Sequence, residues 1–133
     1  PEAPSNQAWQ KSVKVLVAED NAINQMVLQK MLDGLGVEST IVGNGRLALE
    51  KVKEPIEYDV ILMDIMMPEM DGYESTRKIR MHTGKANRPY IIGLSANAFW
   101  DDKLKAFEAG MNDFVTKPVT SKALKAALHK SMG

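Results

Sequence analysis

The stretch YDVILMDIMMPEMDGYE, residues 58–74, decides the fold. Its apolar run, residues 60–63, leads directly into one carboxylate, Asp64. A continuous apolar run of this length is typical of a strand that is covered on both faces, as in a parallel sheet. A buried strand that ends in a charge indicates that the charged group has a task at that end. Pro68 and Gly72 mark the loop that follows.

Four further segments resemble this strand and alternate with helical patterns. Strands are expected at 13–18, 37–42, 59–64, 90–95 and 113–117. The helical segments are 25–36, 45–53, 71–81, 99–110 and 121–132. In the first helix, the spacing predicts one buried face, made of Val27, Leu28, Met31, Leu32 and Leu35. Asn21 is its expected N-cap, the Gly34/Gly36 pair its expected end, Gly110 ends the fourth helix, and Thr120 or Ser121 caps the last.

Five βα units predict an α/β fold: a doubly wound, parallel, five-stranded (βα)5 sheet with helices on both faces. In such sheets, ligands bind beyond the carboxyl ends of the strands. The residues at those ends are therefore the candidate site.

Composition is that of an ordinary soluble domain. The chain has 133 residues, zero net charge, 44% hydrophobic residues and no cysteine. These values argue against a nucleic-acid surface, a disulfide framework and a cysteine metal site. No signal peptide and no membrane-spanning apolar run is found. The chain lacks an initiator Met, and its polar opening, residues 1–12, is expected to be a linker from a preceding domain, with the folded domain at 13–133.

Three acids, one hydroxyl and one lysine stand at the strand ends: Glu19, Asp20, Asp64, Ser95 and Lys117. Two carboxylates about 4 Å apart repel by about 4 kcal/mol at an effective dielectric constant near 20. Either some of the acids are protonated or a divalent cation neutralises them. An all-oxygen site with room for water suits Mg²⁺. Individually, these residues also fit helix caps, a simple salt bridge or loop positions, but together they favour a site.

The sequence resembles the receiver domain of two-component phosphorelay signalling, the phosphoacceptor domain of response regulators and hybrid histidine kinases. The matching pieces are VLVAEDNAINQ, DVILMDIMMPEMDGYE, IIGLSANA and GMNDFVTKPV, and the resemblance, with its βα spacing, extends over residues 13–132. EDN followed by Asn24 is most similar to receivers attached to hybrid kinases. The resemblance implies a flavodoxin-like fold with strand order 2-1-3-4-5.

The resemblance also implies roles for the site residues. Asp64 would take a phosphoryl group from a phosphohistidine. Asp20 and Asp64 would bind Mg²⁺ (or Mn²⁺), with Glu19 acting directly or through water and the carbonyl of Met66 completing the protein ligands. Lys117 would balance the phosphoryl oxygens, and a cis bond to Pro118 would aim it inward. The domain would catalyse its own phosphorylation and dephosphorylation without being a turnover enzyme.

The switch implied by the family runs through Ser95 and Phe114. The hydroxyl moves toward the phosphoryl group, and the aromatic ring fills the space this opens. Phe114 has no hydroxyl for a hydrogen-bonded version of the signal, and a permanent core position is the alternative. Met66 and Asn97 would set the phosphoryl lifetime, which we expect to be long because Met66 cannot orient a water. Ala96 is small, which would leave an opening through which phosphate can enter the site.

Expected partners are a histidine kinase core or a histidine-phosphotransfer protein. They would dock on the first helix after Asn21 and on the loop at Pro118 and Val119. Ile23 and Met26 are candidate apolar contacts there, with burial in the core as the equal alternative. No contact with nucleic acid or membrane is expected. The domain would be a cytoplasmic monomer or weak dimer. Its expected parent is a hybrid sensor histidine kinase, which can itself be membrane-anchored.

The sequence argues against two other classes of function. A phosphatase of the haloacid-dehalogenase type would need a second acid two residues after Asp64, where Met66 stands. A flavin- or nucleotide-binding domain would need a Gly- or hydroxyl-rich loop after the first strand, where this chain has the acidic AEDNAIN, which repels phosphate unless a metal intervenes. A stand-alone response regulator and a non-phosphorylated interaction module of the same fold remain open. His82 and His129 are expected to be solvated surface residues.

Overall fold

The computed structural model describes residues 13–86, 88–97 and 99–132, and these form one five-stranded parallel sheet. Its strand order is β2-β1-β3-β4-β5, which confirms both the predicted fold class and the predicted order. The strands are β1 (Lys14–Ala18), β2 (Glu38–Val42), β3 (Val60–Asp64), β4 (Tyr90–Ser95) and β5 (Asp113–Thr116). Each agrees with its sequence prediction to within one residue at either end. The predicted linker, residues 1–12, lies outside the described residues.

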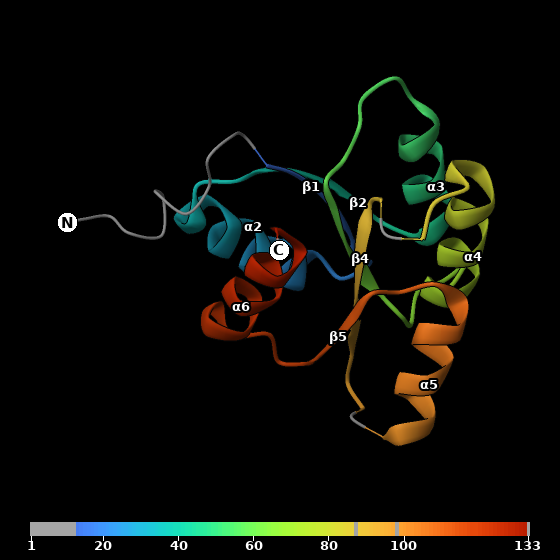
Figure 1. The fold of residues 1–133 in the computed structure, drawn as a ribbon. Helices are drawn as coiled ribbons and strands as arrows, with labels where there is room; N and C mark the ends of the chain where they lie inside the picture. Colours follow the sequence, from blue (N-terminus) through green and yellow to red (C-terminus); the bar gives the residue numbers. More distant parts are fainter. Residues whose placement is uncertain (1–12, 87, 98, 133) are drawn as a thin grey trace.

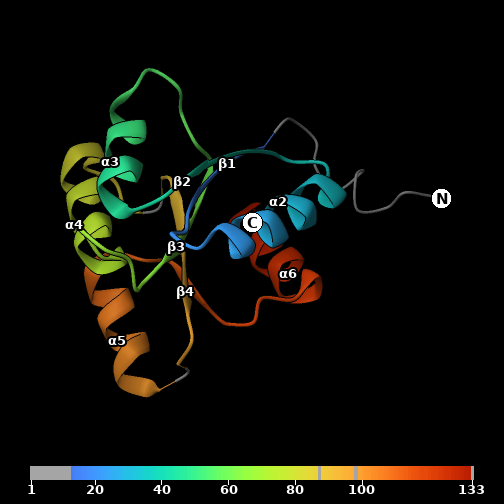
Figure 2. The ribbon, with the colours of Figure 1, turned by 180° about the vertical axis from the view of Figure 1, so that it is seen from behind.

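Helices cover both faces of the sheet, as Figures 1 and 2 show from opposite sides. They are α2 (Ala22–Leu35), α3 (Gly45–Lys53), α4 (Gly72–Thr83), α5 (Trp100–Ala109) and α6 (Ser121–Met132). Helices α2 and α6 lie on one face and α3, α4 and α5 on the other (Figure 1). Side chains of each strand point alternately to the two faces, so the core divides into two clusters, one under each helical layer. In the described part of the chain, no helix is both long and apolar enough to cross a membrane.

Strand β3 lies at the centre of the sheet, between β1 and β4. All five of its residues are buried, which explains its unbroken apolar sequence. Its register places Met63 beside Ala18 of β1 and Asp64 beside Leu94 of β4. The end of β3 is thus flanked by hydrogen-bonded strands, and Asp64 itself is paired with β4.

Helix α2 begins and ends where the sequence predicts. Asn21 Oδ1 accepts the N–H of Asn24 at 2.9 Å, and Gly36 adopts the left-handed conformation, with a φ of 78°, that ends the helix. The buried face consists of Leu28, Leu32 and Leu35. The prediction that Val27 belongs to this face is wrong, since 44% of its surface is exposed. Val27 precedes Leu28 by about 100° around the helix, which turns it toward the edge of the packed stripe.

A half-buried arginine of α4, Arg80, ties the loops that lead into β4 and β5 to this helix. Arg80 donates hydrogen bonds to Gly110 O at 2.9 Å, Pro89 O at 2.8 Å and Asn112 Oδ1 at 2.6 Å. Burial lowers the pKa of Arg80 to about 10. Asn112 Oδ1 also accepts the N–H of Ile91, at the start of β4. This network fixes the start of β5 and so the strand whose far end leads to Lys117.

Candidate active site

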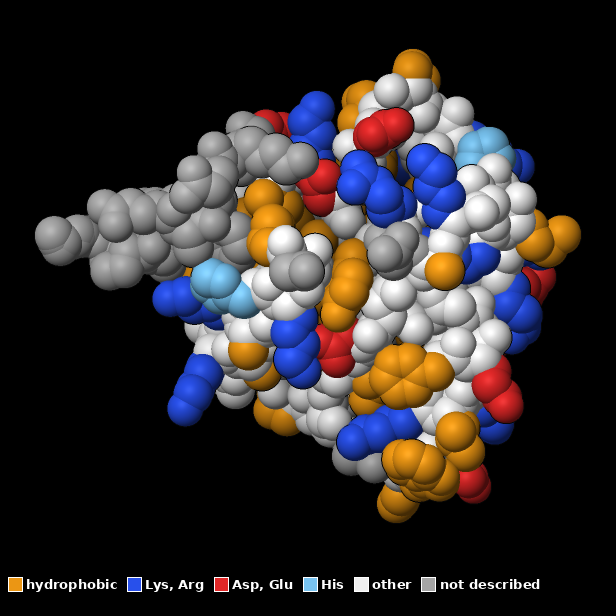
Figure 3. Space-filling model, in the orientation of Figure 1, with side chains coloured by type: hydrophobic (Ala, Val, Ile, Leu, Met, Phe, Trp, Pro, Cys, Tyr) orange, Lys and Arg blue, Asp and Glu red, His pale blue; other side chains and the backbone are white. Residues whose placement is uncertain are grey.

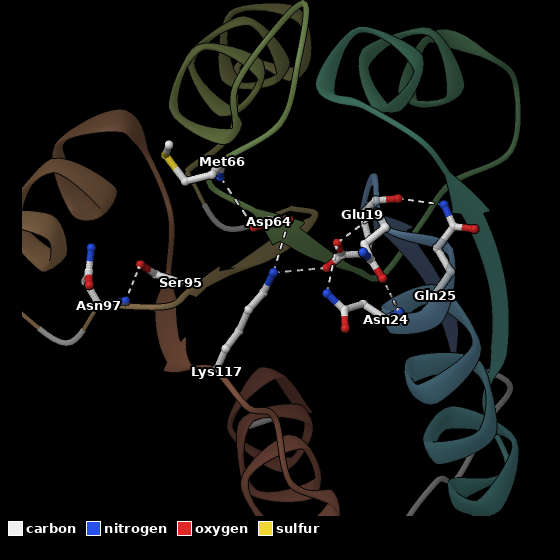
Figure 4. A network of polar contacts seen from close by, with 9 residues as sticks. Glu19, Asn24, Gln25, Asp64, Met66, Ser95, Asn97 and Lys117 are labelled. Atoms are coloured by element: carbon white, nitrogen blue, oxygen red, sulfur yellow. Dashed lines mark hydrogen bonds and ion pairs between the residues drawn. The ribbon is translucent and has the colours of Figure 1, made fainter.

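The residues expected at the strand ends meet at the carboxyl edge of the sheet (Figure 4). Glu19 and Asp20 follow β1, Asp64 ends β3, and Lys117 follows β5. One carboxylate oxygen from each of the three acids lies within 4.8 Å of the others. Glu19 and Asp64 are buried, whereas Asp20 is exposed. The ends of two strands, β1 and β3, therefore build one acidic cluster with one open side.

Lys117 is the cation of this cluster. Its Nζ lies 3.1 Å from Asp64 Oδ2 and 3.2 Å from Glu19 Oε1. The bond between Lys117 and Pro118 is cis, as the resemblance predicts, and Arg88–Pro89 is cis as well. Lys117 N–H also donates to Ser95 O at 2.7 Å, which ties the lysine backbone to the end of β4. A single ammonium thus stands between two buried carboxylates.

The electrostatics of the cluster are unbalanced. Burial, and then the negative charge of Glu19, raise the pKa of Asp64 to about 6, although Lys117 acts in the opposite direction. Burial alone would lower the pKa of Lys117, but the attraction of Asp64 and Glu19 raises it above its ordinary value. Three carboxylates against one ammonium leave an excess of negative charge that one lysine does not neutralise.

This donor set fits a hard divalent cation. Carboxylate oxygens are the ligands that Mg²⁺ prefers, and the exposed side of the cluster leaves room for the waters that Mg²⁺ retains. Asp20 and Asp64 could hold the ion directly. Glu19 is less available, because Lys117 Nζ and the N–H of Asn21 already donate to its two carboxylate oxygens.

The loop after β3 lies tightly against the backbone of Asp64. The N–H of Gly72 donates to Ile65 O at 2.9 Å, and a Cβ added to Gly72 would collide with Asp64 O and lie 2.9 Å from Ile65 Cα. The N–H of Met66 lies 3.4 Å from Asp64 Oδ1. Gly72 is therefore required for close approach, a role that its position in a turn did not reveal.

The predicted switch and lifetime residues occupy different surroundings. Ser95 is buried at the end of β4, and its Oγ accepts the N–H of Asn97 at 3.1 Å, so the hydroxyl is turned toward Asn97 (Figure 4). Ala96 and Asn97 are exposed. Phe114 is half-buried and packs against the cluster under α3, α4 and α5. Met66 is 76% exposed.

The first turn of α2 contributes polar contacts that the sequence prediction missed. Gln25 Nε2 donates to the backbone O of Glu19 at 2.6 Å, and Asn24 Nδ2 donates to Glu19 Oε2 at 3.4 Å (Figure 4). The available signal was the spacing: both amides follow the acid pair within one helical turn, where their side chains can reach back over the helix start.

An apolar cavity of about 390 Å³ lies beside the cluster. Its lining includes Val27, Leu94, Pro118 and Val119 together with Glu19 and Lys117. At the start of α2, Ile23 and Met26 are 70% and 60% exposed, which excludes the alternative that they belong to the core. A larger cavity of about 610 Å³ lies at the opposite edge of the sheet, lined by the ends of α3 and α4 and away from Glu19, Asp20 and Asp64. His82 and His129 are both exposed.

The family model of the response regulator receiver domain matches residues 15–129. The chain belongs to this family. Among curated relatives, it is 44% identical over 121 residues to hybrid signal transduction histidine kinase L of Dictyostelium discoideum, covering 88% of this chain and 7% of that protein. It is 42% identical over 134 residues to histidine protein kinase 1 of Candida albicans, covering 95% of this chain and 5% of that protein. The receiver chain thus spans only a small part of the length of these kinases.

Two solved structures are informative about the site. The receiver domain of the sensor histidine kinase PA1611 from Pseudomonas aeruginosa is 40% identical, with a TM-score of 0.82, covering 92% of this chain and 99% of that one. It holds a magnesium ion in its active site cleft. The receiver domain of Ssk1 from Saccharomyces cerevisiae, in complex with the histidine phosphotransfer protein Ypd1, is 32% identical, with a TM-score of 0.76, covering 85% of this chain and 83% of that one.

Proposed function

We propose that this receiver domain accepts a phosphoryl group from a phosphohistidine onto Asp64 in a Mg²⁺-dependent reaction. The observation that carries the proposal is the position of Asp64: a buried carboxylate at the end of the central strand, 3.1 Å from Lys117 Nζ and within one cluster with Glu19 and Asp20. Magnesium in the related PA1611 receiver supports the choice of ion.

In the proposed reaction, a carboxylate oxygen of Asp64 attacks phosphorus. The new P–O bond forms as the P–N bond of the donor breaks, and the imidazole nitrogen leaves with the electron pair. Phosphoryl transfer passes through a loose, in-line transition state, so positioning and charge neutralisation dominate catalysis. Mg²⁺ at the acid cluster would neutralise part of the charge on the phosphoryl oxygens.

The chain's own groups have separate tasks in this reaction. The sheet pairs Met63 with β1 and Asp64 itself with β4, so the nucleophile is fixed before the donor arrives. Lys117 already lies beside Asp64 Oδ2 and would shift its ammonium to a phosphoryl oxygen. Ser95 would turn its hydroxyl from the Asn97 N–H toward the new phosphoryl group, which draws the end of β4 inward.

That movement is the proposed signal. It would alter the face that β5 and α5 present, with half-buried Phe114 following the displaced loop. Figure 3 shows apolar side chains gathered over α5, and the exposed ones include Phe99, Trp100, Leu104 and Phe107. Apolar groups in solvent make this face a candidate output surface.

The proposed donors are a histidine kinase core or a histidine-phosphotransfer protein. Exposed Ile23 and Met26 and the apolar cavity at Val27, Pro118 and Val119 form a surface suited to an amphipathic helix next to Asp64. The Ssk1 receiver in complex with Ypd1 supports this class of partner. We further propose that the domain works in the cytoplasm as part of a hybrid histidine kinase, which the two kinase relatives support.

Intact-mass spectrometry tests the proposal. The chain is incubated with acetyl phosphate, with and without MgCl₂, and afterwards with a phosphorylated histidine-phosphotransfer protein. One Mg²⁺-dependent, base-labile phosphoryl adduct is expected, and it should be absent from Asp64→Asn. Asp59→Asn is the matched control because Asp59 immediately precedes the same strand at its other end; this variant should be labelled normally. No adduct from either donor would leave a non-phosphorylated interaction module as the function.

A further inference from the structure

The segment that joins β1 to α2 is held by several hydrogen bonds at one residue, Glu19. Its backbone N–H donates to Val42 O at 3.0 Å, and its backbone O accepts from Gln25 Nε2 at 2.6 Å. Its Oε1 accepts from Lys117 Nζ at 3.2 Å, while Oε2 accepts from the N–H of Asn21 at 3.2 Å and from Asn24 Nδ2 at 3.4 Å. Both backbone groups and both carboxylate oxygens of Glu19 therefore have partners.

Asp20 differs from Glu19 in this respect. It is exposed, and it follows Glu19 directly at the start of the loop. The direction in which its carboxylate points depends on the peptide that joins the two acids. That peptide's oxygen is the atom that Gln25 holds, by the shortest of the contacts to Glu19. Gln25 is half-buried, so the bond is shielded in part from competing water.

We propose that Gln25, assisted by Asn24, is a positioning residue that holds the Glu19–Asp20 peptide in the geometry that Mg²⁺ requires. This inference rests on the proposed function and adds to it two residues that carry no charge and contact no metal. Groups that orient metal ligands through hydrogen bonds commonly change metal affinity by about 10- to 100-fold when they are removed.

A positioning role predicts a particular change of ion preference. Mg²⁺ demands near-ideal octahedral geometry, whereas Ca²⁺ accepts more ligands at longer and more variable distances. Loosening the Glu19–Asp20 peptide leaves the number of carboxylates unchanged. It should therefore weaken Mg²⁺ binding much more than Ca²⁺ binding. A change of charge alone, or a general loss of structure, would affect both ions alike.

The test is an NMR titration of the unphosphorylated chain with MgCl₂ and, separately, with CaCl₂. Gln25→Met removes the amide donor and retains side-chain length and helix propensity. Gln29→Met is the matched control: the same residue type one turn later in α2, bonded to Ser39 and Asp33 instead of the acid pair. For Gln25→Met, the Kd for Mg²⁺ should rise about 10-fold and the Kd for Ca²⁺ less than about 3-fold. Gln29→Met should match the wild type.

A second variant guards against misfolding of the first. Asn24→Ala removes the longer contact, so the Kd for Mg²⁺ should rise by a smaller factor and in the same direction. Equal Mg²⁺ affinity in Gln25→Met and Gln29→Met would overturn the inference, as would equal losses for the two ions. If the wild-type chain itself failed to bind Mg²⁺, the metal dependence of the proposed function would fall too. Binding by the wild type with unaffected variants would remove only the positioning role.

Discussion

Lys117 reaches Asp64 across an intervening strand. Their side chains meet at 3.1 Å, yet β4 lies between β5, which Lys117 follows, and β3, which Asp64 ends. The long, flexible lysine stem crosses the end of β4 and brings one ammonium to two carboxylates, those of Asp64 and Glu19. A cation is thus present in the cluster before any metal or phosphoryl group arrives. We expect it to oppose the binding of Mg²⁺ and to assist the transfer of the phosphoryl group.

Replacing Lys117 by Met should separate metal binding from phosphoryl transfer. Without the ammonium the cluster is more negative, so Mg²⁺ should bind more tightly, by roughly 10-fold. Labelling of Asp64 by acetyl phosphate should fall by at least about 100-fold, because the charge on the phosphoryl oxygens loses its second cation. Calorimetry measures the first quantity and intact mass the second.

Lys117 lowers the pKa of Asp64, so its removal raises that pKa. Lys117→Met should therefore be studied at about pH 8, where Asp64 stays ionised. Lys122→Met, at an exposed position of α6, serves as the control and should change neither quantity. Weaker Mg²⁺ binding in Lys117→Met would contradict the view that lysine and metal compete for the same carboxylates.

Asp64→Asn should stabilise the metal-free protein. Burial and Glu19 raise the pKa of Asp64 from 3.8 to about 6, so its ionised form is disfavoured in the folded chain. A neutral amide avoids this cost, and the free energy of unfolding at pH 7 should rise by about 1–2 kcal/mol, allowing for partial screening by solvent. Urea unfolding of both proteins in EDTA at pH 7 measures this difference in the free energy of unfolding.

The gain from Asp64→Asn should depend on pH with a definite sign. Between about pH 4 and pH 6 the folded wild type binds more protons at Asp64 than the unfolded chain, so wild-type stability falls as pH rises through this window. The difference between variant and wild type should be largest above about pH 6 and vanish near pH 4. A constant difference from pH 4 to pH 8 would show that the amide acts through packing. Added Mg²⁺ should reverse the order by stabilising only the wild type.

The sequence predicted the fold, and the meeting of the candidate site residues at one edge, for a physical reason. In a parallel sheet all strands end at one edge, so strand periodicity alone brings Glu19, Asp64 and Lys117 together. The pattern of apolar and polar residues says less about the direction in which an individual helix or loop side chain points. The sequence therefore did not show that Gln25 holds Glu19, that Arg80 links the loops before β4 and β5, or that Val27 faces solvent. These depend on distances between elements, which periodicity does not specify.

Met66 should prolong the life of the aspartyl phosphate. Its side chain is 76% exposed beside Asp64 and has no group that can orient an attacking water. Met66→Asn places an amide there, so dephosphorylation should be several-fold faster, at unchanged Mg²⁺ affinity. The decay of the phosphoryl adduct, followed by intact mass after removal of acetyl phosphate, measures the rate. Met81→Asn, on the equally exposed α4 surface, is the control. A wild-type half-life of only seconds would contradict the prediction.

Gly72 and Gly34 should respond oppositely to alanine. A Cβ at Gly72 would collide with the carbonyl oxygen of Asp64, at the start of α4. The backbone that carries the nucleophile must then shift, and Gly72→Ala should lower the free energy of unfolding by about 1–3 kcal/mol and slow labelling of Asp64. At Gly34, inside α2, no described atom outside its own helical backbone and chain neighbours lies within 4 Å of the added Cβ. Gly34→Ala should raise stability by about 0.5–1 kcal/mol through helix propensity, with labelling unchanged. Urea unfolding and labelling rates on both variants test this pair. Normal labelling in a folded Gly72→Ala would mean that the loop after β3, and not the strand, absorbs the displacement.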